Sequence, residues 1–138
     1  MEKYYVDACC NHHINRGTWA VIHGDKTYTG MVKPHKGRVN SGYCELYAVY
    51  QALQLTDDEK KTIIYNDNKG VVQLLNKEEC YKKTGRPNYN ELLRIVHPLY
   101  HNLMNVKVCK VGRKENRVAD YLAKKTMKEH MKSENRIT

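Results

Sequence analysis

The chain lacks phenylalanine and has one tryptophan, Trp19, so its aromatic packing must come largely from its 11 tyrosines. It also lacks an apolar run long enough to span a membrane, and its N-terminus does not read as a signal peptide. Its five cysteines form an odd set without a paired framework. These absences predict free thiols in a reducing compartment, a cytoplasmic location and no membrane partner.

Acidic residues are fewer than basic ones: the chain has 15 Asp and Glu against 24 Lys and Arg, which gives a formal net charge of +9. Such an excess predicts an anionic partner, and nucleic acid is the commonest one for a small basic domain. Plain solubility is the alternative explanation of the charge. At 138 residues the chain is predicted to form a single domain, residues 1–138, with a real hydrophobic core.

Hydrophobic periodicity predicts an α/β fold with a five-stranded mixed sheet flanked by helices. Strands are predicted at residues 4–9, 18–23, 27–32, 62–65 and 106–111. The first three are closely spaced and therefore antiparallel, whereas the last two need crossover connections and are therefore parallel additions. Helices are predicted from about residue 41, over 68–75, over 88–103, and from about residue 116.

Local signals refine the helix ends. Ser41 is predicted to cap the first helix and Asn116 the last one. Pro98 predicts a kink or a break in the third helix. The polar tail from Lys128 is predicted to fray.

Four acids recur in the order strand, helix, strand end, helix: Asp7, Glu45, Asp67 and Asp120. Each alone has a structural explanation, such as an exposed strand position, a favourable helix dipole or an N-cap. Together they can meet at one edge of the sheet, where four carboxylates would repel one another without cations. Hard divalent ions with oxygen ligands remove that repulsion, which predicts Mg²⁺ or Mn²⁺.

The segments around these acids resemble the type 1 ribonuclease H family. The matching segments are residues 5–9, 40–48, 63–68 and 112–123, and the similarity extends over nearly the whole chain. The last segment is the most specific, because it carries a Gly, then Glu-Asn, then an Asp followed by Leu-Ala at the family's spacing. All four segments occur in the family's order and on the expected kinds of element.

The resemblance implies a ribonuclease H-like fold and an endonuclease that hydrolyses the RNA strand of RNA–DNA hybrids, leaving 5′-phosphate ends. Asp7, Glu45, Asp67 and Asp120 would be catalytic and would hold two Mg²⁺ ions, with Mn²⁺ as a substitute. Glu45 would also help to position the RNA, whose 2′-hydroxyl distinguishes it from DNA. A monomer without an organic cofactor is implied. Substrate contacts are predicted at Asn11, His13, Asn40, Ser41, Asn68, Lys110 and Asn116.

Two departures from the family pattern stand out. Lys110 occupies the place, ten residues before the last acid, where many members carry a histidine that assists turnover. A lysine of ordinary pKa does not shuttle protons near pH 7, although it can bind phosphate. The segment between Asp67 and Lys110 is too short for the basic protruding handle of bacterial members. Residues 77–87 resemble a trimmed loop instead, which predicts a handle-less variant. The basic loops at 33–38 and 77–86 are predicted to follow phosphates.

Other patterns were weighed against this interpretation. Cys9, Cys10, His12 and His13 have the side chains of a zinc site, but adjacent ligands on a strand point to opposite faces. His97 and His101 have the i, i+4 spacing of metal ligands, yet their apolar neighbours favour a packed helix face. At the level of function, the alternatives are a junction-resolving nuclease of the same fold and a non-catalytic nucleic-acid-binding module.

Overall fold

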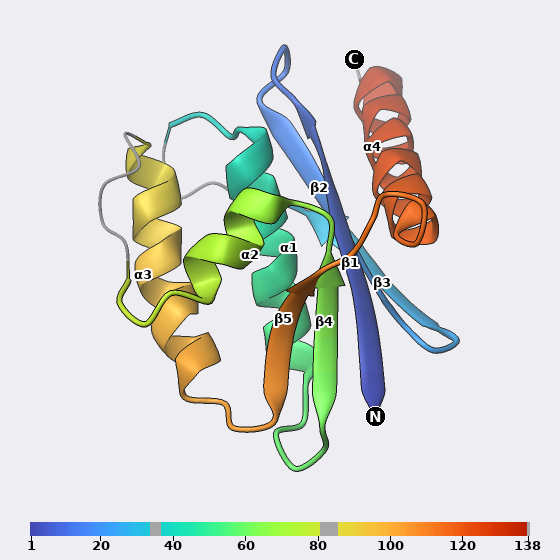
Figure 1. The fold of residues 1–138 in the computed structure, drawn as a ribbon. Helices are drawn as coiled ribbons and strands as arrows, with labels where there is room; N and C mark the ends of the chain where they lie inside the picture. The colour runs from blue at the N-terminus through green and yellow to red at the C-terminus, as the bar shows by residue number, and fades with distance from the viewer. Residues whose placement is uncertain (34–36, 81–85, 138) are drawn as a thin grey trace.

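The computed structural model describes residues 1–33, 37–80 and 86–137, and Figure 1 shows their arrangement. Its centre is a five-stranded sheet in the order β3-β2-β1-β4-β5. The strands are β1 (Glu2–Asn11), β2 (Arg16–His23), β3 (Lys26–Met31), β4 (Thr62–Asn66) and β5 (Val106–Lys110). The first three pair antiparallel, and β4 and β5 join them in parallel. The predicted mixed sheet is therefore confirmed.

Four helices cover the sheet: α1 (Ser41–Leu55), α2 (Lys69–Leu75), α3 (Pro87–His101) and α4 (Arg117–Ile137). Figure 1 shows α1, α2 and α3 on one side of the sheet and α4 on the other. α1 packs against β1, β2 and β4, whereas α4 packs against β1, β2 and β3. This arrangement places the N-terminal ends of α1 and α4 over the central strand from opposite sides.

The core is aliphatic at its centre, with Val6, Val21, Leu46 and Ile64 fully shielded from solvent. Its aromatic members are tyrosines, as the absence of phenylalanine predicts, and among the described residues the buried ones are Tyr4, Tyr43, Tyr89 and Tyr100. Within the described ranges, no helix combines the length and the apolar character that a membrane crossing requires.

Two predicted helix ends are wrong, and of the kink or break predicted at Pro98 the break does not occur. Asn40, not Ser41, caps α1, because its side chain accepts a hydrogen bond from the Tyr43 amide at 2.9 Å. Pro98 does not break α3, which continues to His101. The polar tail does not fray, since α4 remains helical to Ile137, far beyond Lys128. Long polar helices of this kind depend on tertiary packing, which local composition does not report.

The predicted trimmed loop at 77–87 includes residues 81–85, and the predicted phosphate-tracking loop at 33–38 includes residues 34–36. Both stretches lie outside the described residues. The handle-less prediction therefore stays a prediction.

Candidate active site

The four predicted acids approach one another where β1 and β4 separate. Val6 of β1 and Asn66 of β4 form the last pair between these parallel strands. Asp7 directly follows Val6, and Asp67 directly follows Asn66. α1 packs on both strands and brings Glu45 to them. Asp120 lies in the first turn of α4. A pocket of about 410 Å³ is lined by all four acids.

Three of these acids form a tight cluster. Asp7, Glu45 and Asp67 each offer a carboxylate oxygen, and these oxygens lie within 4.8 Å of one another. Asp120 lines the same pocket but is outside that triad, and Lys124 donates a hydrogen bond to its Oδ2 at 3.0 Å. The prediction that the sheet edge gathers the acids is confirmed for the triad, with Asp120 beside it.

Burial and mutual repulsion make this cluster electrostatically unfavourable. Asp7 is 4% and Glu45 7% exposed. Burial is the main reason that the pKa of Asp7 is raised to about 6, and the charge of Asp67 acts in the same direction. Burial, then the charge of Asp7, raises the pKa of Glu45 well above its usual range. Burial also raises the pKa of Asp67, although the guanidinium of Arg113 opposes this.

The donor set fits a divalent cation. The three clustered groups offer only oxygen atoms, which hard cations such as Mg²⁺ prefer. The protein donates few hydrogen bonds to them. The backbone amide of Ala8 donates to Asp7 at 2.9 Å, and the side-chain amide of Asn66 donates to Glu45 at 2.9 Å. A cation between the carboxylates would offset the repulsion that raises their pKa values. The residues present therefore match the requirements of a metal site.

The predicted substrate contacts divide into two groups. Ser41 and Asn68 line the acid pocket, and Lys110 ends β5 as an exposed residue whose charge, like that of Arg113, opposes the rise in the pKa of Asp67 that burial causes. Asn40 and Asn68 also cap α1 and α2, so their side-chain oxygens are already used. His13 is exposed.

Two predicted contacts are engaged within the protein. Asn11 accepts from the His13 amide at 3.1 Å and its amide group faces the sulfur of Met131 at 4.0 Å. Asn116 is fully buried, and its Nδ2 donates to the Val6 carbonyl at 2.8 Å. Asn116 is therefore neither a surface contact nor a side-chain cap of α4, and both predictions for it are wrong. The contact of Asn116 with β1, which buries it, was not visible from its position before the last helix.

The rejected metal patterns remain unsupported. In the part of the chain that the structure describes, the acid triad is the only group of His, Cys, Asp and Glu that meets the geometry of a metal site. His97 and His101 instead stack with ring centroids 3.9 Å apart. Each Nε2 donates at 2.7 Å to a backbone carbonyl, of Lys77 and Leu75 respectively. The pair is structural.

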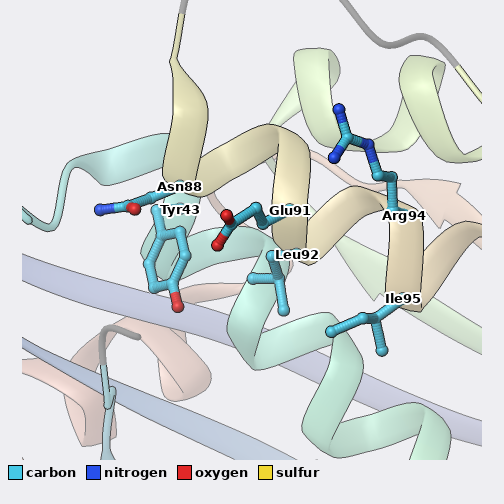
Figure 2. A pocket seen from close by; sticks show the side chains of 6 residues that line it. All are labelled: Tyr43, Asn88, Glu91, Leu92, Arg94 and Ile95. Atoms are coloured by element: carbon cyan, nitrogen blue, oxygen red, sulfur yellow. The ribbon is translucent and has the colours of Figure 1, made fainter. Parts of the chain in front are cut away.

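A second pocket of about 390 Å³ lies between α1 and α3. Figure 2 shows that Tyr43 comes from α1 and the other labelled side chains from α3. Its lining mixes one acid with one base and contains none of the predicted site residues: Tyr43, Asn88, Glu91, Leu92, Arg94 and Ile95. It therefore lacks the concentration of carboxylates that sets the acid pocket apart.

The sequence patterns missed three residues of the acid site. Arg113 and Lys124 line the pocket and supply its positive charge. Asn66 is fully buried and bonds directly to Glu45. Two signals for them exist in the sequence: Lys124 follows Asp120 by one helical turn, and Asn66 is a polar residue at the end of an apolar strand.

Solved structures with the same fold are ribonucleases H1. The enzyme of the halophilic archaeon Halobacterium salinarum NRC-1 matches with a TM-score of 0.70 and 19% identity, covering 93% of this chain and 98% of that one. LC11-RNase H1, isolated from compost by a metagenomic approach, matches with a TM-score of 0.71 and 16% identity, covering 94% and 97%. The same LC11 enzyme in complex with an RNA/DNA hybrid matches with a TM-score of 0.67 and 17% identity, covering 88% and 93%.

At these identities the structural matches establish the fold. No curated protein matches the chain significantly. The family model of RNase H, however, matches residues 2–128, which is most of the sequence and includes all four acids. With the sheet order and the carboxylate cluster, this match shows that the chain belongs to the RNase H family.

Proposed function

We propose that this chain is a metal-dependent endonuclease that hydrolyses the RNA strand of RNA–DNA hybrids and leaves 5′-phosphate and 3′-hydroxyl ends. The observation that carries the proposal is the convergence of Asp7, Glu45 and Asp67 within 4.8 Å at the end of two parallel strands. It is supported by membership of the RNase H family and by the similar structure that was solved with a hybrid.

Asp7, Glu45, Asp67 and Asp120 would hold two Mg²⁺ ions, with Mn²⁺ as a substitute. Bound there, divalent cations supply an activated water and a Lewis acid for the leaving oxygen. Asp7 and Asp67, whose carboxylate oxygens lie within 4.8 Å of each other, would orient the scissile phosphate. Glu45, which comes from α1, would contact the 2′-hydroxyl beside the cut, which DNA lacks.

The positive residues around the pocket give the substrate's phosphates a place to bind. Arg113 and Lys124 line the pocket itself, and Lys110 stands at the end of β5. Ser41 is exposed at the mouth of the pocket, where its hydroxyl is available to a backbone phosphate. Since these contacts are mainly ionic and shape-driven, binding should weaken steeply as salt increases.

The wider setting is part of the proposal. We propose a monomeric, handle-less, cytoplasmic enzyme without an organic cofactor. The five cysteines are all free, which supports a reducing compartment. Lys110 would bind phosphate rather than replace the histidine that many family members use in turnover.

The test is a cleavage assay on a labelled RNA–DNA hybrid, double-stranded RNA, double-stranded DNA and a four-way DNA junction, each with Mg²⁺, Mn²⁺ or EDTA. We expect cleavage of the hybrid's RNA strand alone, with either cation and not with EDTA. Asp67→Asn should slow it by at least about 100-fold, because one carboxylate ligand of the cations is lost. Asp25→Asn, in the exposed turn between β2 and β3, is the matched control and should leave the rate unchanged.

Two results would overturn the proposal. Junction cleavage with an intact hybrid would indicate a resolvase on the same fold. Hybrid binding without cleavage under any of the metal conditions would indicate a non-catalytic binding module.

A further inference from the structure

The carbonyl group of Val6 lies at the point where β1 and β4 separate. The Val6–Asn66 pair is the last rung of this parallel ladder, and Asp7 and Asp67 follow immediately on either side of the opening. A buried carbonyl at the end of a ladder needs another donor, because leaving it unpaired would cost free energy. Two side-chain amides supply that donor.

Asn66 provides the first amide and uses all of its polar atoms within the site. Its Nδ2 donates to the Val6 carbonyl at 3.0 Å and to Oε2 of Glu45 at 2.9 Å. Its Oδ1 accepts from the Asn68 amide at 2.9 Å. The side chain is fully buried. One residue therefore ties β1, α1 and the segment that carries Asp67 together.

Asn116 provides the second amide from the opposite side of the sheet. Its Nδ2 donates to the same Val6 carbonyl at 2.8 Å, and its own backbone carbonyl accepts from the Asp120 amide at 3.1 Å. The start of α4, which carries Asp120, is thus linked to the same carbonyl oxygen to which Asn66 links Glu45. Asn66 links the Val6 carbonyl to Glu45 and to its own neighbour Asp67. Asn116 links the same carbonyl to Asp120, and Asp7 directly follows Val6 in the chain.

We propose that Asn66 is a positioning residue of the catalytic site, which sets the placement of Glu45 relative to Asp7 and Asp67 through the Val6 carbonyl, with Asn116 anchoring the helix of Asp120 to the same carbonyl. The inference rests on the proposed function, because it assigns Asn66 a role in holding the metal ligands. Asn66 itself is not a ligand.

The chemistry of the position requires an asparagine. Asn66 must donate two hydrogen bonds and accept one within a closed space. A serine has a single donor and is too short to reach both acceptors, and an aspartate would turn an oxygen toward Glu45 and toward the Val6 carbonyl. Partners that orient metal-binding carboxylates typically change metal affinity by about 10–100-fold when they are removed.

The experiment compares Asn66→Ser with a control in another asparagine that bonds in the same way. Asn76 also donates twice, to the carbonyls of Val72 and Val108, and accepts once, from the Tyr100 hydroxyl. It contacts none of the four acids. Asn76→Ser should therefore lose hydrogen bonds of the same number and kind without disturbing the site.

Three measurements are made on the full chain: the urea midpoint, the Mg²⁺ concentration that half-saturates the protein in calorimetry without substrate, and kcat and KM on the hybrid. For Asn66→Ser we expect a half-saturating Mg²⁺ concentration raised about 10–100-fold and a kcat that excess Mg²⁺ restores in part, with KM little changed. Asn76→Ser should lower the urea midpoint and leave the Mg²⁺ dependence at the wild-type value.

An Asn66→Ser protein with wild-type Mg²⁺ affinity would overturn the inference, as would an Asn76→Ser protein with the same loss of affinity. If Asn66→Ser does not fold, Asn116→Ser decides by the same criteria. Because Mg²⁺ binding is measured without substrate, a failure of the positioning role of Asn66 can be distinguished from a failure of the proposed cleavage of RNA–DNA hybrids. A wild-type chain that binds Mg²⁺ but leaves the hybrid intact would refute the proposed substrate, while weakened binding in the variant would still support the positioning role.

Discussion

Two clusters of titratable side chains differ in how far the protein itself satisfies them. His97 and His101 stack on each other, and each donates a short hydrogen bond to a backbone carbonyl. The carboxylates of Asp7, Glu45 and Asp67 instead crowd together with few donors, and their pKa values are raised. The histidines are held by hydrogen bonds within the protein, whereas the repulsion among the carboxylates would be relieved by a bound cation.

The contrast shows how a site can be told from a structural cluster in this protein. The histidines have the i, i+4 spacing of metal ligands, although their apolar neighbours favoured a packed helix face, whereas the order of the acids along the strands and helices predicted a metal site. The difference lies in the partners: the histidine rings stack and donate to backbone carbonyls, whereas the buried carboxylates repel one another. Carboxylates that destabilise one another persist only where the rest of the fold holds them together, which is typical of functional sites.

The largest expected effect separates activity from stability at the acid cluster. Asp7→Asn should lower kcat on the hybrid by at least about 100-fold, equivalent to about 3 kcal/mol or more. In metal-free solution at pH 8 the same variant should unfold at a higher urea concentration than the wild type, because one buried charge and its repulsion are gone. Single-turnover cleavage and urea titrations measure the two. A variant that is both less active and less stable would show that the charge of Asp7 does not destabilise the folded protein.

The second prediction concerns the histidine pair and has the opposite pattern. His97→Ala should cost about 1–3 kcal/mol of unfolding free energy, because a buried side chain and its bond to the Lys77 carbonyl are lost. Below the melting temperature kcat and Mg²⁺ affinity should match the wild type. Urea denaturation and calorimetry measure these quantities. A loss of Mg²⁺ affinity in this variant would show that the pair is coupled to the site.

The third prediction concerns the pH dependence of the metal-free protein. The pKa of Asp7 is about 6 in the folded chain against 3.8 as its ordinary value, so the folded state binds more protons between these values. The contribution of Asp7 is therefore fully present below about pH 4 and is lost as pH rises through 6, by about 1–3 kcal/mol. Burial of Glu45 acts in the same direction.

Urea midpoints of the wild type and Asp7→Asn from pH 4 to 8, without metal, measure this loss as the difference between two curves. Added Mg²⁺ should raise the wild-type midpoint more at pH 8 than at pH 5, since protons compete with the cation. Parallel curves for the two proteins would show that Asp7 does not carry a raised pKa.

Much of the fold follows from local pattern. Ile63 and Ile64 form a strand because they are β-branched and apolar, and the closeness of the first three strands requires antiparallel pairing. The helix ends were less predictable. Asn40 and Ser41 are both good N-caps in isolation, and only the packing of α1 decided between them. The length of α4 likewise depends on its contacts with β1 and β2 rather than on its polar composition.

The sequence by itself determined which acids this protein has and in what order they follow its strands and helices. It also determined the excess of positive charge around them. Only the tertiary structure decided that Asp7, Glu45 and Asp67 meet while Asp120 lies outside their cluster, and that Asn116 is buried instead of exposed. The physical reason is that hydrogen bonds such as those to the Val6 carbonyl join residues 60 and 110 positions apart, and no local pattern records them.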